Sequence, residues 1–139
     1  AHEVAQLFQD RDLVSAAVVG REGKLLGRIT VDDVVDEVRR AAADGFHTLW
    51  AAQIFGHDAL TLLAIAGREV PGIELGTAVV PTYPRHPMML AQQALSVQAA
   101  VGGRPALGIG LSHRIVIESM MGMSFDKPVR HMREYLGIE

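Results

Sequence analysis

Two groups of residues in this chain have types and positions that could do chemistry. Thr30 and Asp33 stand at the start of a predicted helix, where a carboxylate can accept hydrogen bonds from two hydroxyls and a helix N-terminus can bind phosphate. Gln53, Thr77 and His113 end or follow predicted strands, and such positions line the reactive face of a parallel βα barrel. Thr30 and Asp33 also fit a pair that merely caps the helix, so both interpretations of them stay open.

Glycines accompany the second group. Gly76 would let the backbone approach a flat ring closely, whereas Gly108 and Gly110 fit barrel packing as well as ligand contact. No residue is assigned as catalytic, because Ser112 and His113 are neighbours in the chain that point in different directions and do not form a nucleophile–base pair. The histidines show no metal-ligand spacing, so the sequence predicts no metal site.

An alternation of strands and helices must position these residues. Hydrophobic periodicity and Gly/Pro stops predict strands over 13–19, 25–30, 47–52, 73–80 and 106–111, and helices over 3–11, 31–43, 88–101 and 115–121, with two more that begin near Asp58 and Asp126. The first two strands form a hairpin, and the later βα repeats imply a parallel sheet with right-handed crossovers. Trp50 and the methionines at 88, 89, 120, 121 and 123 are expected in the core.

The composition fits a folded domain and excludes several classes of protein. The 139 residues are 49% hydrophobic and contain no cysteine, so disulfides and thiolate chemistry are excluded. A net charge of −3 argues against nucleic acid as a partner. The longest apolar stretch, 59–66, is well short of the ~20 residues that span a bilayer. With no signal peptide recognised, we expect a cytoplasmic protein without membrane insertion. A complete (β/α)8 barrel needs about 250 residues, more than this chain has.

The first 38 residues carry one resemblance. The segments LFQDRDLVSAAVV, GREGKLLG and GRITVDDVVDEV resemble the closing part of a CBS domain, as in magnesium transporters of the MgtE type. The resemblance rests on a pattern of Gly27, Ile29, Thr30 and Asp33 that leads from strand into helix. It implies that Thr30 and Asp33 face an adenine nucleotide, with Asp33 on the ribose hydroxyls. The opening strand and helix of such a motif are missing.

Residues 36–137 resemble the luciferase-like monooxygenases, most of all the branch that uses the deazaflavin coenzyme F420. The segments RRAAADGFHTLWAAQIFG, IELGTAVVPTYPRHPMMLAQQALSVQAA, GRPALGIGLSH and SFDKPVRHMREYL carry this resemblance. It implies an α/β fold in which they form strands two to four of a TIM barrel, a third strand with a bulge that presses on the cofactor ring, and F420 or FMN as cofactor. The implied cofactor-binding residues lie at the strand ends: Gln53, Gly76, Thr77, Ala78, Val79, Leu111, Ser112 and His113.

The two resemblances together suggest a chimera with a boundary near residue 38. Residues 1–38 would be a partial CBS-like segment with a helix and a β-hairpin, and residues 39–139 a partial, or half, TIM barrel built of parallel βα repeats. We hypothesise that the strand over 25–30 takes the place of the first barrel strand. A half barrel leaves unpaired strand edges, so we expect a homo-oligomer that forms through them.

Three functions follow from these resemblances. The first is an F420- or FMN-dependent oxidoreductase whose barrel is incomplete, and which is therefore inactive or only weakly cofactor-binding in isolation, because hydride transfer needs walls that exclude water. The second is a folded chimera, natural or engineered, with no activity of its own. The third is an adenine-nucleotide-binding regulatory module of the CBS type. Whether the chain is an enzyme stays open, and the sequence identifies no substrate.

Overall fold

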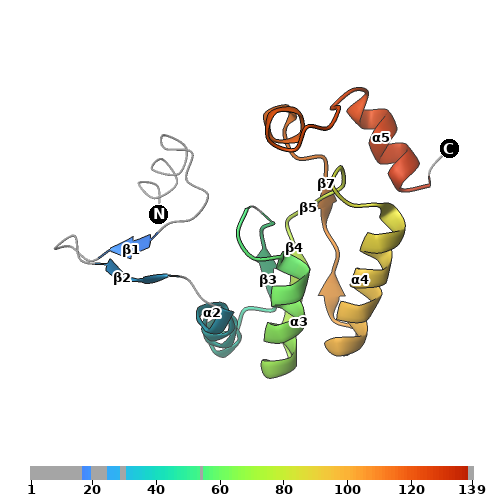
Figure 1. Cartoon of the computed structure of the whole chain (residues 1–139). Helices are drawn as coiled ribbons and strands as arrows, with labels where there is room; N and C mark the ends of the chain where they lie inside the picture. Colours follow the sequence, from blue (N-terminus) through green and yellow to red (C-terminus); the bar gives the residue numbers. More distant parts are fainter. Residues whose placement is uncertain (1–16, 20–24, 29–30, 54, 138–139) are drawn as a thin grey trace.

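Helices and strands alternate along the chain in this computed structural model, which describes residues 17–19, 25–28, 31–53 and 55–137 (Figure 1). The elements are β1 (Ala17–Val19), β2 (Leu25–Arg28), α2 (Val31–Ala43), β3 (Thr48–Ala51), α3 (Ala59–Glu69), β4 (Glu74–Thr77), β5 (Val80–Pro81), α4 (Pro87–Ala100), β6 (Pro105–Ala106), β7 (Ile109–Gly110), the π-helix η1 (Val116–Met120) and α5 (Pro128–Tyr135). From α2 onward, these positions agree with the predicted alternation to within a few residues at most ends. Thr30 and the predicted helix over 3–11 lie outside the described residues.

The later strands are parallel, as the βα repeats predicted. One sheet has the order β3-β4-β6, and β5 pairs with β7 in a second, two-stranded sheet. Two of the predicted strands are each divided in two. The predicted strand over 73–80 is divided into β4 and β5, and the one over 106–111 into β6 and β7. The described residues thus form two small parallel sheets and not a closed barrel.

A bulge explains the division of the strands. The pairing of Gly76 with Ala106 is followed by the pairing of Val80 with Ile109, so residues 77–79 face only residues 107–108. One extra residue on one strand is the definition of a β-bulge. The peptide bond between Ala78 and Val79 within it is cis. The bulge expected in the third strand of the family is therefore present.

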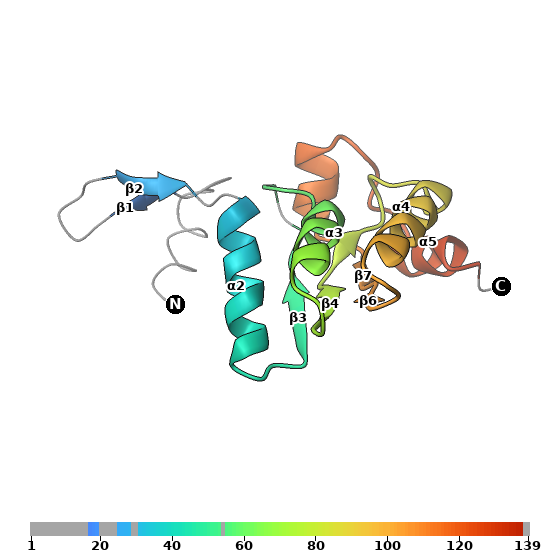
Figure 2. The same ribbon diagram turned by 90° about the horizontal axis from the view of Figure 1, so that it is seen from below.

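The hydrophobic core lies between the helices and one face of the β3-β4-β6 sheet. Helix α3 packs between α2 and α4 (Figure 2). Side chains from all three helices and from the sheet form a single buried cluster: Val35, Val38, Leu60, Leu63, Ala66, Val70, Ile73, Leu75, Val80, Leu90, Val97 and Val101. Because side chains alternate along a strand, Leu49 and Ala51 face this core while Trp50 faces away from it.

A single arginine joins the ends of these elements. The Arg104 guanidinium donates hydrogen bonds to the carbonyl oxygens of Val101 (2.8 Å), Ile73 (2.6 Å) and Gly67 (2.7 Å). The last carbonyls of a helix have no partner within the helix, so they need donors from elsewhere. Arg104 supplies them at the ends of α3 and α4 and before β4.

Two expectations about packing are wrong. Trp50 is 53% exposed, and all five methionines that we expected in the core are exposed. Their hydrophobicity predicted burial, but they lie on surfaces that no other described element covers.

Strand β2 does not take the place of a first barrel strand, since it pairs antiparallel with β1 alone and not with β3. β1 and β2 are close to each other in the chain, and pairing between nearby segments costs less entropy than pairing with a distant strand.

None of the described helices combines the length and the hydrophobicity that crossing a bilayer requires.

Candidate functional site

Six of the eight predicted cofactor-binding residues lie along one edge of the parallel strands, which we call the strand-end edge: Gln53, Ala78, Val79, Leu111, Ser112 and His113. Gln53 follows β3, and Ala78 and Val79 follow its parallel neighbour β4, so these three lie at the same edge of the first sheet. Leu111, Ser112 and His113 follow β7 of the second sheet, whose partner β5 begins directly after Val79. Ala78, Val79 and His113 are exposed, and Ser112 has a left-handed backbone with φ of 65°. The topology thus brings together three short segments that are distant in the chain.

Thr77 and Gly76, the other two predicted residues, lie deeper. Thr77 is completely buried, and its hydroxyl donates to the Gly108 carbonyl (2.8 Å) and accepts from the Gly108 N–H (2.9 Å). Gly76 is covered by the indole of Trp50, which occupies the space where a Cβ atom would stand. Both residues shape the strands beneath the edge, and neither residue is open to a ligand.

The glycines of β7 and of the link before it also contact the chain itself. A Cβ atom on Gly108 would overlap the Thr77 carbonyl oxygen, and one on Gly110 would meet the side chain of Val79. This supports the packing interpretation of the two glycines. Val79 lies against β7 in this way while 41% of its surface stays exposed at the strand-end edge.

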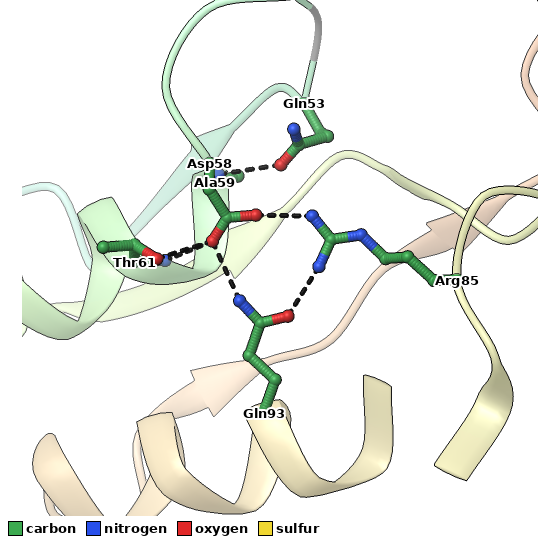
Figure 3. A network of polar contacts seen from close by, with 6 residues as sticks. All are labelled: Gln53, Asp58, Ala59, Thr61, Arg85 and Gln93. Carbon is green, nitrogen blue, oxygen red and sulfur yellow. Dashed lines mark hydrogen bonds and ion pairs between the residues drawn. The ribbon is translucent and has the colours of Figure 1, made fainter. Parts of the chain in front are cut away.

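A closed hydrogen-bond network holds two loops beside this edge (Figure 3). Asp58 caps α3, as the sequence predicted, by accepting from the Thr61 N–H (2.8 Å) and hydroxyl (2.7 Å). Its other contacts are an ion pair with Arg85 (2.5 Å) and a hydrogen bond from the Gln93 amide (2.9 Å). Arg85 also donates to Gln93 (2.5 Å), which completes a ring of three side chains. The network fixes the loop after β3 against the loop after β5.

The charge of Asp58 is stabilised in this network. Partial burial by itself would raise the pKa of Asp58, but hydrogen bonds from Thr61 and Arg85 outweigh burial, so the pKa lies below its ordinary value. A carboxyl whose pKa is lowered on folding stabilises the folded state fully above its unfolded-state pKa, and loses that contribution as the pH falls through its folded-state pKa.

Asp58→Asn is therefore expected to lower the free energy of unfolding by about 1–2 kcal/mol at pH 7, since an amide has one acceptor oxygen where the carboxylate offers two to its donors. The difference from wild type should stay constant above about pH 5 and shrink below about pH 4. Urea denaturation at a series of pH values measures it. A difference that grows on acidification would contradict the role of Asp58.

An aromatic cluster, missed by the sequence analysis, attaches α5 to the loop after β5. The His131 ring stacks on Tyr83 with centroids 3.9 Å apart, Tyr83 stacks on Phe125 at 5.1 Å, and Tyr135 lies 5.7 Å from His131. His131 Nε2 is 3.0 Å from the hydroxyl of the buried Thr82. His131 and Glu134 are three residues apart on α5 and could form a surface pair, but Glu134 pairs with Arg130 instead. The i,i+4 spacing of His131 and Tyr135 was the one available signal of this cluster.

Burial raises the pKa of both tyrosines in the cluster, Tyr83 and Tyr135, and their buried hydroxyls have no hydrogen-bond partner among the described residues.

The turn before α4 has two separate roles. Arg85 belongs to the Asp58 network, and His86 caps α4 by accepting from the Met88 N–H (3.2 Å). Both contacts fix the turn at the start of α4.

Parallel strands, a bulged third strand and polar strand ends are the features that the family resemblance implied. The family model described as luciferase-like monooxygenase matches residues 8–138. The chain belongs to the luciferase-like monooxygenase family. Its α/β architecture of parallel strands and helices is accordingly that of the family.

Several luciferase-like relatives are similar over most of the chain. A Mycobacterium tuberculosis protein named for a coenzyme F420-dependent oxidoreductase is 40% identical over 103 residues, which are 73% of this chain and 30% of that protein. The F420-dependent tetrahydromethanopterin reductase of Methanopyrus kandleri superposes with a TM-score of 0.64 at 22% identity, over 70% of this chain and 28% of that one. The oxygenating constituent of 3,6-diketocamphane monooxygenase from Pseudomonas putida, in complex with FMN, gives 0.67 at 21%, over 76% and 32%.

The chain spans about a third of the length of the luciferase-like relatives that it matches. A shorter similarity relates it to the magnesium transporter MgtE of Thermus thermophilus, with 42% identity over 52 residues, or 37% of this chain and 12% of the transporter. The match to the luciferase-like family model begins at residue 8, so it includes most of residues 1–38, the segment that resembles a CBS domain.

Proposed function

We propose that this chain provides the cofactor-binding edge of an F420- or FMN-dependent oxidoreductase of the luciferase-like family. The observation that carries the proposal is the bulge at Ala78 and Val79, two exposed residues between β4, which pairs with the strand before Gln53, and β5, which pairs with the strand before Leu111–His113. The mycobacterial relative whose name gives F420 as the coenzyme, at 40% identity, supports the choice of cofactor class.

The residues of the strand-end edge suit a flat heterocycle. Val79 offers a partly exposed apolar surface on which a ring can lie, and the small Ala78 beside it leaves room for the ring. Gln53, Ser112 and His113 carry the hydrogen-bonding groups around this surface. When bound, a deazaflavin or flavin would supply hydride transfer, and the part of this chain would be to bind and orient the ring.

The single tryptophan of the chain gives a direct test. Trp50 is half-exposed on the sheet face below the edge, so bound F420 or FMN, both of which absorb at the wavelengths of indole emission, should quench its fluorescence. We expect saturable quenching on titration of the purified chain. Val79→Asp should weaken binding at least about tenfold, because it places a charge on the apolar surface.

Val129→Asp is the matched control, since Val129 is an exposed valine on α5. It should bind the cofactors as wild type does. The proposal fails if neither cofactor quenches Trp50, or if both aspartate variants bind equally well.

We further propose that residues 1–38 are a CBS-like segment joined to a luciferase-like segment at 39–139, with adenine-nucleotide binding through Thr30 and Asp33 as the second candidate function. The similarity to MgtE over 52 residues supports the presence of a CBS-like segment. Asp33 is exposed in the first turn of α2. If ATP raises the melting temperature of wild type but not of Asp33→Ala, the regulatory function is favoured. No effect of F420, FMN or ATP would favour a chain without activity of its own. Self-association through sheet edges stays a prediction.

A further inference from the structure

We propose that Gln53 is a specificity-determining residue whose side-chain NH2 group donates a hydrogen bond to a carbonyl oxygen on the ring of the bound cofactor. The inference rests on the proposed function, and it adds the chemical group that this part of the strand-end edge recognises. It is drawn from the orientation of one amide and from the contacts that hold that amide in place.

The orientation of the Gln53 amide follows from its partner. Its Oε1 atom accepts a hydrogen bond of 2.8 Å from the backbone N–H of Ala59. A backbone N–H can only donate, so the amide oxygen must face it and the NH2 group must point elsewhere. Figure 3 shows the side-chain nitrogen of Gln53 on the far side from this bond. Within residues 31–53 and 55–137, Gln53 forms no other side-chain hydrogen bond.

The contacts around Ala59 prevent the amide from turning over. Ala59 is the first residue of α3 and is completely buried, so its N–H would lose its acceptor if the amide rotated. Asp58, directly before it, is held by Thr61, Arg85 and Gln93. The start of α3 is thus fixed from three sides, and the strand-end edge presents a donor at Gln53.

A fixed donor selects an acceptor on the ligand. Oxidised flavins and deazaflavins share carbonyl oxygens on their pyrimidine ring, so the same NH2 group can serve FMN and F420. A site that is built to hydrogen-bond one group discriminates strongly against ligands that lack it, because the unpaired polar group then loses its water without gaining a partner. Gln53 would therefore contribute to recognition of the ring and not of the cofactor tail.

Gln53→Glu separates this role from a structural one. A carboxylate keeps an acceptor for the Ala59 N–H, and a negative charge is favourable at a helix N-terminus, so the melting temperature should stay close to that of wild type. The donor is lost, so the Kd for F420 and for FMN, measured by Trp50 quenching at pH 7.5, should rise at least about tenfold. The Kd of Gln53→Glu should fall again toward pH 5 relative to that of wild type, as protonation restores a donor to the side chain.

Gln92→Glu is the matched control, because it adds the same charge on the exposed face of α4 and should leave the Kd unchanged. Gln53→Met removes the NH2 group without adding charge, and should also weaken binding at least about fivefold even if Gln53→Glu folds poorly. Wild-type affinity in either folded Gln53 variant would overturn the inference while leaving the proposed function intact. A wild-type chain that binds neither cofactor would overturn both.

Discussion

Gly108→Ala is expected to destabilise the chain by about 3 kcal/mol or more. The new Cβ atom would overlap the carbonyl oxygen of Thr77, which belongs to the backbone and cannot move aside as a flexible side chain would. To remove this overlap, the two strands would have to separate at the bulge. The buried Thr77 hydroxyl would then lose both of its hydrogen bonds to Gly108. Since folded domains are stable by only about 5–15 kcal/mol, this is a large fraction of the total.

Urea denaturation of wild type, Gly108→Ala and Gly56→Ala would measure the effect. Gly56 is the matched control, because a Cβ atom there meets nothing within 4 Å and its backbone lies outside the left-handed region. We expect Gly56→Ala to change the free energy of unfolding by less than about 1 kcal/mol. Equal stability of the two alanine variants would show that Thr77 and Gly108 do not approach each other as described.

Arg104→Met is expected to lower the free energy of unfolding by about 3 kcal/mol. Its guanidinium serves the carbonyl oxygens of Gly67, Ile73 and Val101, which lie at the ends of three elements, and methionine keeps most of the aliphatic volume while removing every donor. A hydrogen bond from a charged donor stabilises more than one from a neutral donor, and the carbonyls of these three buried residues would lose that donor.

The melting temperature and the free energy of unfolding of Arg104→Met should be compared with those of Arg133→Met. Arg133 is exposed on α5, so its replacement removes the same charge at little cost. Arg104→Lys should recover only part of the stability, because an ammonium group cannot reproduce the planar set of donors that reaches three carbonyls. Full stability in Arg104→Met would mean that the three carbonyls need no donor from this side chain.

The parts of the fold that could be predicted from the sequence depend on nearby residues. The cap at Asp58 contacts Thr61, three positions away. Apolar periodicity predicted the helix over 31–43, and the structure has α2 there, with Val35 and Val38 buried. The alternation of strands and helices gave the parallel sheet, and parallel strands in turn bring Gln53, Val79 and His113 to one edge. Exposure was harder to predict, because whether Trp50 is covered depends on which distant element lies over it.

Patterns in the sequence therefore predicted the class of fold, the family and the edge at which we propose that a ligand binds. Only the tertiary structure decided which groups at that edge are free to meet one. Thr77 looked like a ligand contact, but its hydroxyl binds Gly108, 31 residues away, and His131 lies beside Thr82, 49 residues away. Capping and periodicity depend on residues a few positions apart. Whether a hydrogen-bonding group has a partner within the protein or stays available to a ligand depends on which distant residues the complete fold brings next to it.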